Sequence, residues 1–272
     1  ESDPAKATEN AGKLIKRDKV DVIVGTVHSG VALALTRVAR ETNTLLINPN
    51  AGADEITGSL CAPNIFRVSF SAWQPSYAMG NVMLERKHKN VVTLAWKYSF
   101  GEQSVAAFKE AFEKGGGKVV KEMTLPFPNT EFQPYLTEIA ALKPDAVFVF
   151  FSGAGAVKFV KDYVAAGLKT SIPLYAPGFL TDGTLEAMGD AGAGLLTTLH
   201  YADGLENAKD KAFRTRYAIT YKMQPDVFAV QGYDAAQLLA AGVGAVKGDL
   251  GKRADMVKAM ETAKIDSPRG AF

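Results

Sequence analysis

A histidine and a serine stand side by side in the stretch VGTVHSG, which ends an apolar run at residues 24–30. Such a pair is a candidate for a nucleophile with its base, for a metal ligand or for a ligand-binding loop. A nucleophile elbow needs glycine two residues before and after the serine, because the turn leaves no room for a side chain. Val27 and Val31 hold those positions around Ser29. We therefore do not expect His28 and Ser29 to be catalytic, and we expect the chain not to be an enzyme.

Metal and cofactor sites are not indicated by the residues that usually build them. The three histidines have no close His, Cys or carboxylate partners in the sequence, and the single cysteine, Cys61, excludes an internal disulfide. The glycines of SGAGAVK at 152–158 begin a dinucleotide-binding pattern, but Lys158 stands where the third glycine belongs. Glycines that let a helix begin close to a sheet explain this segment better. We expect no metal and no cofactor.

The composition is that of an ordinary globular chain, with 272 residues, 47% hydrophobic residues, 22% charged residues and a formal net charge of +2. Lysine and arginine are scattered along the chain, which argues against nucleic acid as a partner. The sequence holds no run of 18 or more apolar residues, so no membrane span is predicted.

The elements that position these residues alternate between strands and helices. The apolar runs are rich in Val, Ile, Leu and Phe with little strict alternation, which is typical of strands covered on both faces. Segments of helical period lie between them, and this alternation predicts an α/β fold with mostly parallel, doubly wound sheets and helices on both faces. The expected strands are 20–24, 44–48, 65–69, 91–96, 118–123, 145–151, 172–176 and 194–199.

A pattern that occurs twice in the sequence indicates two lobes built alike. KVDVIVGTVHSG, a helix and TLLINPNAG are matched later in the chain by KPDAVFVFFSGAG, a helix and IPLYAPGFL. Both copies read as a strand, a Ser/Gly loop, an amphipathic helix, a second strand and a turn that contains proline. Matched flanks on two copies favour a repeated lobe over coincidence.

Five loops follow the carboxyl ends of the expected strands, where open parallel sheets bind their ligands. We expect Ser29 to be the N-cap of a helix whose free backbone N–H groups, from Gly30 onward, attract an anion. If two lobes face each other, the five loops line a shared cleft for a small molecule. The loops are Val27-His28-Ser29, Asn50-Ala51-Gly52, Lys97-Tyr98-Ser99-Phe100, Ser152-Gly153-Ala154 and Gly178-Phe179-Leu180.

Motifs along essentially the whole chain resemble those of the branched-chain amino acid binding protein family, which has the type I periplasmic binding fold. The matching segments include VDVIVGTVHSGVALALTRVARETNTLLINPNAGADEIT, KPDAVFVFFSGAGAVKFVKDYVAAGL, LYAPGFLTD and VFAVQGYDAAQLL. The resemblance implies a first lobe of residues 1–70 with 202–272 and a second lobe of 71–201. It also implies that opening and closing elements of the family, and its signal peptide, are absent from this chain.

The same resemblance implies a function and an anion site. Members of the family are periplasmic, monomeric receptors that deliver a solute to the membrane permease of an ABC importer. The family holds the substrate carboxylate with the loop that matches Val27, His28 and Ser29, assisted by residues that match Asn50, Ala51 and Gly52.

At the other end of the substrate the chain departs from the family pattern. Where the family places an acidic residue for the substrate ammonium, this sequence has Gly178, and a buried ammonium without a partner is costly. Aromatic residues of the second-lobe loops are expected to wall the cleft there, so the chain resembles the aromatic-acid receptors of the family, for benzoate, hydroxybenzoate, cinnamate or phenylpyruvate. The expected contacts of the second lobe are Tyr98, Phe100, Ser152, Gly153, Gly178 and Phe179, whereas Trp73, Trp96 and Phe151 could wall the cleft or belong to the core.

Two alternatives stay open. The ligand could be a branched-chain amino acid or amide, whose ammonium would then need an acidic partner from the absent opening segment. The chain could also be a ligand-sensing regulatory domain of the same fold.

Overall fold

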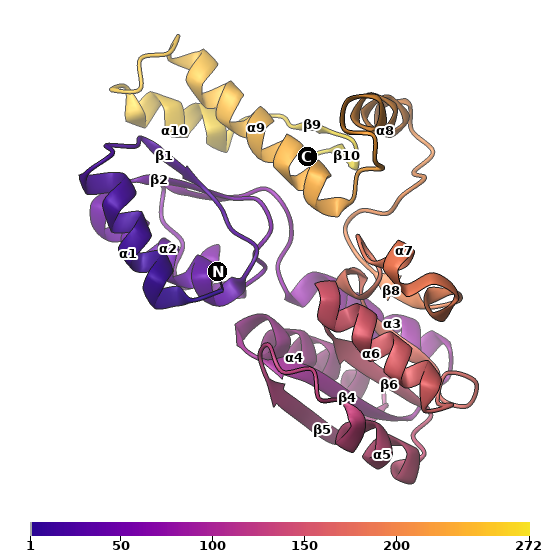
Figure 1. Ribbon diagram of the computed structural model, residues 1–272. Coiled ribbons are helices and arrows are strands. Elements are labelled where there is room, and N and C mark those ends of the chain that lie inside the picture. Colours follow the sequence, from indigo (N-terminus) through magenta and orange to yellow (C-terminus); the bar gives the residue numbers. More distant parts are fainter. Residues whose placement is uncertain (1) are drawn as a thin grey trace. The chain divides into compact units, whose positions relative to one another are not determined.

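The computed structural model describes residues 2–272. The chain folds into two compact units. Unit 1 comprises the chain up to Phe70 together with His200–Phe272, and unit 2 is Ser71–Leu199. The chain therefore leaves unit 1 after Phe70 and returns to it at His200 (Figure 1). Within residues 2–272, none of the helices has the length and apolar character that crossing a membrane requires.

Unit 1 is built around a parallel sheet of three strands in the order β1 (Val22–Val24), β2 (Leu45–Asn48) and β3 (Ile65–Arg67). Alternate residues of a strand point to opposite faces, and β2 follows this rule. Its Leu46 belongs to one apolar core with Val31, whereas Leu45 and Ile47 belong to another.

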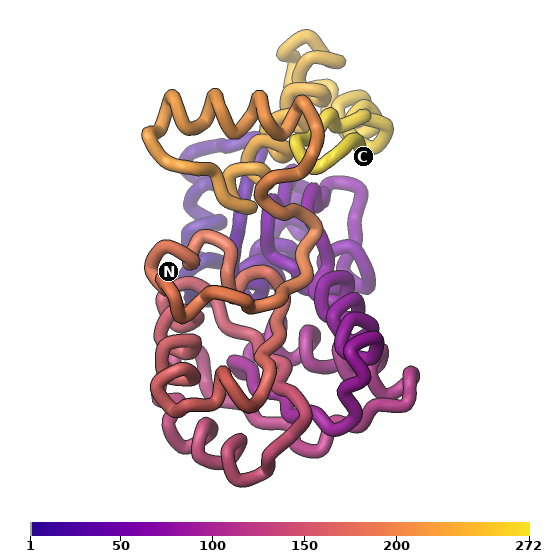
Figure 2. The backbone as a smooth tube through the Cα atoms, turned by 90° about the vertical axis from the view of Figure 1, so that its right-hand side faces the viewer, coloured from indigo at the N-terminus to yellow at the C-terminus, as the bar shows by residue number. Residues whose placement is uncertain are grey.

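Helices cover both faces of this sheet because each face is apolar. Helices α1 (Pro4–Lys16) and α2 (Ser29–Thr42) pack on the Leu46 side, and α9 (Val227–Ala245) and α10 (Arg253–Glu261) pack on the other side (Figure 1). The unit therefore combines the two ends of the described chain, and Figure 2 shows the yellow C-terminal elements gathered near the indigo N-terminal ones.

The rest of unit 1 is a helix and a short hairpin. Helix α8 (Ala208–Tyr221) begins after Asn207, whose side chain accepts a hydrogen bond from the backbone N–H of Asp210 at 2.7 Å. Strands β9 (Asp266–Ser267) and β10 (Gly270–Ala271) pair in antiparallel fashion near the end of the chain. A 3-10 turn, η1 (Asp54–Ile56), follows β2.

Unit 2 has a parallel sheet of five strands in the order β5-β4-β6-β7-β8. These strands are β4 (Asn90–Lys97), β5 (Lys118–Pro126), β6 (Ala146–Phe150), β7 (Leu174–Pro177) and β8 (Leu196–Thr198). Its helices are α3 (Trp73–Glu85), α4 (Ser99–Lys114), α5 (Gln133–Leu142), α6 (Gly153–Ala165) and the short α7 (Leu185–Met188), with 3-10 turns η2 (Gly178–Leu180) and η3 (Gly189–Gly192).

Aromatic side chains fill the two faces of the sheet around β6, which is buried along its whole length. Phe148 stacks on Phe108 of α4 with ring centroids 4.2 Å apart. Phe151, which follows the strand, contacts Phe159 of α6 on the other face, at 4.7 Å. A strand packed on both faces has no need of polar alternation, which explains the continuous apolar run in the sequence.

The predicted fold class is confirmed. Each predicted strand is present, with ends shifted by up to three residues, and both main sheets are parallel as the strand–helix alternation indicated. The β9–β10 hairpin was not predicted, because two-residue strands carry too little pattern to be recognised in a sequence.

Candidate functional site

In unit 1 the structure brings together the two loops that sequence analysis singled out. The backbone N–H of Ala51, after β2, donates to the carbonyl oxygen of Thr26, after β1, at 2.9 Å. The Asn48 side chain bridges the same loops, because its Nδ2 donates to the Ala51 carbonyl at 2.6 Å and its Oδ1 accepts from the Thr26 N–H at 3.4 Å. The loop of Val27–Ser29 and the loop of Asn50–Gly52 are therefore held side by side.

The predicted helix cap in this region was wrong by one residue. His28, not Ser29, is the N-cap of α2: its backbone is extended and its Nδ1 accepts from the Val31 N–H at 3.4 Å. Ser29 is the first helical residue. A histidine was not expected as a cap because serine has the stronger intrinsic preference for that position.

Ser29 keeps a polar group that the helix does not use. Its side chain is only 1% exposed, and among residues 2–272 its hydroxyl oxygen has no hydrogen-bond partner. The first backbone N–H groups of a helix also lack intrahelical acceptors, and the helix dipole makes this end positive. The start of α2 can therefore hold a small anion.

His28 is half-buried, and burial lowers the pKa of its imidazole, which favours the neutral form. Because Nδ1 accepts the hydrogen bond from Val31, a neutral ring carries its proton on Nε2. His28 can thus act as a donor through Nε2. Val27, by contrast, is 62% exposed, so it forms part of a surface of this unit.

Asn50, Ala51 and Gly52 are buried. The Asn50 Nδ2 donates to Oε1 of Gln231 on α9 at 2.7 Å, and Nε2 of Gln231 lies 3.2 Å from Nε2 of His200. Gln231 was missed by sequence analysis, although its segment carried part of the family resemblance. A polar residue within the largely apolar segment VFAVQGYDAAQLL was the available signal.

In unit 2 three of the predicted aromatic residues lie in one cluster. The ring of Phe100 is 5.8 Å from that of Phe179 and 4.5 Å from that of Phe150, and Tyr98 is 5.9 Å from Phe150. Phe150 was not predicted as a site residue, because its position inside a buried strand resembles that of any core residue. Burial raises the pKa of the Tyr98 phenol, so the ring enters the cluster as an uncharged group.

The other tryptophan and phenylalanine candidates lie elsewhere. Phe151 is fully buried and packs against Phe132 and Phe159, which makes it a core residue. Trp96 is 3% exposed, and its Nε1 donates to the backbone of Asn129 at 2.8 Å. Trp73 is on α3, where it stacks on Tyr77 and its Nε1 donates to Glu110.

Gly178 opens the turn η2 and is buried against Leu199. A Cβ at this position would lie 2.7 Å from Cβ and 2.8 Å from Cδ2 of Leu199, closer than real Cβ atoms approach a neighbour. The space beside Gly178 is therefore filled by an aliphatic side chain.

Ser152 and Gly153 lie at the start of α6, with Ser152 as a half-buried N-cap and Gly153 exposed at a φ of +55°. A Cβ at Gly155 would lie 2.4 Å from the ring of Trp96, so this glycine allows the helix to begin against the sheet. That is the structural role expected for the glycines in this segment. Within the described range 2–272, no group of three or more His, Cys, Asp or Glu could hold a metal ion.

The chain is similar to known proteins along its whole length. The family model described as periplasmic binding protein matches residues 1–272. A protein of Brucella melitensis named Leu/Ile/Val-binding protein homolog 6 is 32% identical over 277 residues, which cover 99% of this chain and 70% of the relative.

Two solved structures are also similar. The solute-binding protein of an ABC transporter from R. palustris, in complex with benzoate, is 54% identical with a TM-score of 0.97, over 100% of this chain and 75% of that one. A solute-binding protein of an ABC transporter from Rhodopseudomonas palustris BisB5, in complex with 3,4-dihydroxybenzoic acid, is 33% identical with a TM-score of 0.93, over 99% of this chain and 74% of that one.

Proposed function

The chain belongs to the periplasmic binding protein family, and from that premise we propose that it is the solute receptor of an ABC importer for a small aromatic carboxylate of the benzoate type. The observation that carries this proposal is the 54% identity, over the whole chain, to a receptor that was solved with benzoate. The family implies an extracytoplasmic location and delivery of the ligand to a membrane permease.

The polar end of the ligand is assigned to unit 1. The start of α2 offers the Ser29 hydroxyl, first-turn backbone N–H groups and the Nε2 of a neutral His28. Several neutral donors at the positive end of a helix stabilise a carboxylate without a cationic side chain. Val27, Asn50, Ala51 and Gly52 complete this wall in the proposal.

The apolar end is assigned to unit 2. Phe100, Phe179 and Tyr98 provide aromatic surface, and aromatic rings favour edge-to-face or offset contacts with a benzene ring. Leu199 fills the space beside Gly178, the position at which the family resemblance implies an acidic partner for an ammonium. An amino acid bound here would bury its ammonium without a partner, at a cost of several kcal/mol. Ser152 and Gly153 are assigned to the same wall.

The receptor acts by a shift between open and closed states. A ligand that binds residues of both units favours the conformation in which both can touch it, and it does so only by its difference in affinity for the two states. The permease then distinguishes the closed, loaded receptor from the open one. The proposal treats the receptor as a monomer.

A ligand screen by thermal unfolding tests the proposal. The complete mature protein is heated with benzoate, 4-hydroxybenzoate, cinnamate, phenylpyruvate, leucine or valine. A ligand at one hundred times its Kd adds about 2.7 kcal/mol of stability, which raises Tm by roughly 5–10 °C for a chain of this size. We expect this rise with benzoate or a hydroxybenzoate. A rise with leucine or valine alone would refute the aromatic assignment and favour the amino acid receptor.

A further inference from the structure

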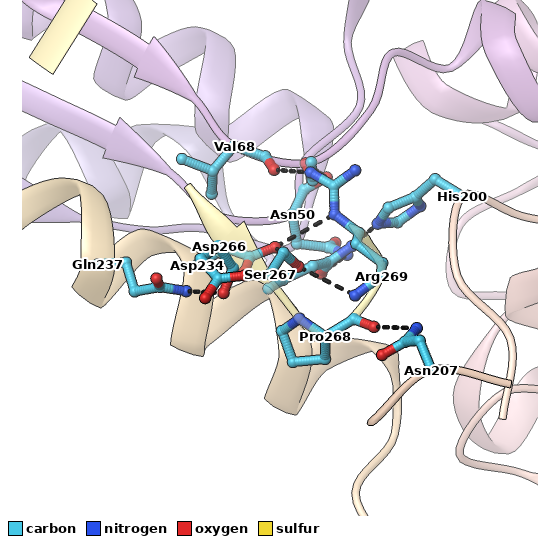
Figure 3. Close-up of polar contacts among 12 residues, drawn as sticks. Asn50, Val68, His200, Asn207, Asp234, Gln237, Asp266, Ser267, Pro268 and Arg269 are labelled. Atoms are coloured by element: carbon cyan, nitrogen blue, oxygen red, sulfur yellow. Dashed lines mark hydrogen bonds and ion pairs between the residues drawn. The ribbon is translucent and has the colours of Figure 1, made fainter. Parts of the chain in front are cut away.

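A chain of hydrogen bonds inside unit 1 connects the proposed ligand loop to the place where the polypeptide returns from unit 2. Asn50 Nδ2 donates to Gln231 Oε1 at 2.7 Å, and Gln231 Nε2 lies 3.2 Å from His200 Nε2. His200 is the first residue of unit 1 after unit 2. Figure 3 shows Asn50 and His200 on either side of Arg269, with dashed lines marking the polar contacts.

The same cluster also holds the other connection between the units. The His200 ring stacks on Phe70, the last residue of unit 1 before unit 2, with centroids 4.9 Å apart and an interplanar angle of 20°. Next to Phe70, the Ser69 hydroxyl donates to the Asn50 carbonyl oxygen at 3.4 Å. Asn50 is therefore tied to both connections, through its side chain to one and through its backbone to the other.

The donor and the acceptor of each hydrogen bond from Asn50 to His200 can be assigned. Because Gln231 accepts from Asn50 through its oxygen, its amide nitrogen must donate, so Nε2 of His200 accepts. Burial and the nearby charge of Arg269 lower the pKa of His200 to about 3, and a neutral ring can accept at Nε2. Gln231 is 1% exposed, so the loss of either partner leaves part of a buried amide without a hydrogen bond, which is costly.

One turn further along α9, a second polar contact fixes the helix that carries Gln231. Asp234 is fully buried and accepts from the Ser267 hydroxyl at 2.9 Å and from Arg269 Nε at 3.1 Å. Arg269 Nη2 in turn donates to the carbonyl of Val68, at 2.6 Å (Figure 3). These contacts tie the turn of α9 next to Gln231 to Ser267, Arg269 and Val68.

We propose that Gln231 is a positioning residue that couples occupation of the ligand loop at Asn50 to the conformation of the two connections between the units. This inference rests on the proposed receptor function. A ligand that draws the Asn50 loop toward itself changes the hydrogen bonds available to Gln231 and thereby to His200. Gln231 thus contributes to the balance between open and closed states without a contact to the ligand.

A double-mutant cycle between Asn50 and His200 tests the coupling. The variants are Asn50→Ala, His200→Phe, which retains a ring to stack on Phe70, and the double variant. The cycle is measured in the wild-type background and in Gln231→Met, with benzoate Kd from calorimetry as the first readout. Coupled residues depart from additivity, here by about threefold or more in Kd, and residues that act independently do not.

The expected result is a non-additive cycle in the wild type and an additive one in Gln231→Met. Additive cycles in both backgrounds would overturn the proposal. If Gln231→Met does not fold, Gln231→Leu replaces it, because it also removes both hydrogen bonds and leaves an apolar side chain in the buried position. Gln237→Met is the matched control: it is on the same helix and donates to the Asp266 carbonyl instead.

A second readout separates coupling from a purely structural role and from the function itself. Dyes are attached to the exposed Cys61 of unit 1 and to Lys161→Cys, an exposed position on α6 of unit 2, and their distance distribution is recorded without ligand. We expect His200→Phe and Gln231→Met to change this distance distribution in the same way, and the double variant to change it no further. The control Gln237→Met should leave it unchanged. No change in either variant would overturn the coupling, even if benzoate binds. If benzoate does not bind, the receptor proposal fails and this readout still decides the coupling.

Discussion

The two groups of proposed contact residues differ in the kind of structure that makes them. In unit 1 the groups are backbone donors, a hydroxyl and an imidazole, fixed by hydrogen bonds such as that from Ala51 N–H to Thr26 O at 2.9 Å. In unit 2 they are rings fixed by packing, as in the contact of Phe100 with Phe150 at 4.5 Å. Polar recognition depends on direction and therefore on a local motif. Apolar recognition depends on volume and therefore on residues that meet only in the folded chain.

The largest expected effect comes from placing a charge in the apolar wall. Gly178→Glu introduces a side chain whose Cβ alone would lie 2.7 Å from Cβ of Leu199, and it buries a carboxylate near the aromatic cluster. We expect benzoate Kd to rise at least about a hundredfold, because a buried unpaired charge costs several kcal/mol. Calorimetry checks this value. The control is Gly178→Gln, which introduces a side chain of the same size without the charge, and an equal loss of affinity there would show that charge is unimportant.

Truncating an aromatic ring in unit 2 should reduce stability as well as affinity. Phe100 is 4% exposed and contacts Phe150 and Phe179, so Phe100→Ala leaves a cavity in the cluster. Burial lost in this way costs about 3 kcal/mol of the free energy of unfolding. Urea denaturation of the ligand-free protein measures it. An unchanged free energy of unfolding would mean that the cluster is not part of the packed core.

In unit 1 the corresponding truncation should separate affinity from stability. Within residues 2–272 the Ser29 hydroxyl has no partner, so Ser29→Ala removes no hydrogen bond from the folded protein. A hydrogen bond to a charged ligand contributes about 1.5 kcal/mol, so we expect Kd for benzoate to rise roughly tenfold. The free energy of unfolding should change by less than about 0.5 kcal/mol. Equal affinity of variant and wild type would remove Ser29 from the site.

Counted per pH unit, the smallest effect is a pH dependence that belongs to unit 1. The unfolded chain protonates a histidine near its ordinary pKa of about 6.5, whereas burial and Arg269 lower the pKa of His200 to about 3 in the folded state. Between these values the unfolded state binds more protons, so stability falls as the pH falls. We expect the wild type to lose roughly 1 kcal/mol per pH unit from pH 6 to pH 4 relative to His200→Phe. Urea denaturation at several pH values measures the difference, and parallel curves would contradict it.

Sequence patterns predicted the sheets well because buried parallel strands leave continuous apolar runs, as in residues 145–151 and β6. They predicted the location of the unit 1 loops for the same reason: both loops follow strands. The choice between His28 and Ser29 as helix cap failed, since both residues can accept from the first turn and only the backbone conformation decides.

Other residues could not be found from local patterns. Gln231 gains its role from Asn50 and His200, which are far away in the sequence. Leu199 acquires significance only because it fills the place beside Gly178. Phe150 looks like any residue of a buried strand until its ring is seen against Phe100. In each case the signal is a tertiary contact, which no spacing in the sequence contains.

The contact between Gly178 and Leu199 sets an order for evolutionary change. A receptor of this kind that acquires an acidic residue at 178 must first, or at the same time, reduce the side chain at 199, because the two cannot share the space. The two positions should therefore covary among relatives, with glycine at 178 beside a large aliphatic residue and a carboxylate beside a small one. A change of ligand from aromatic acids to amino acids would thus pass through an intermediate with a small residue at 199.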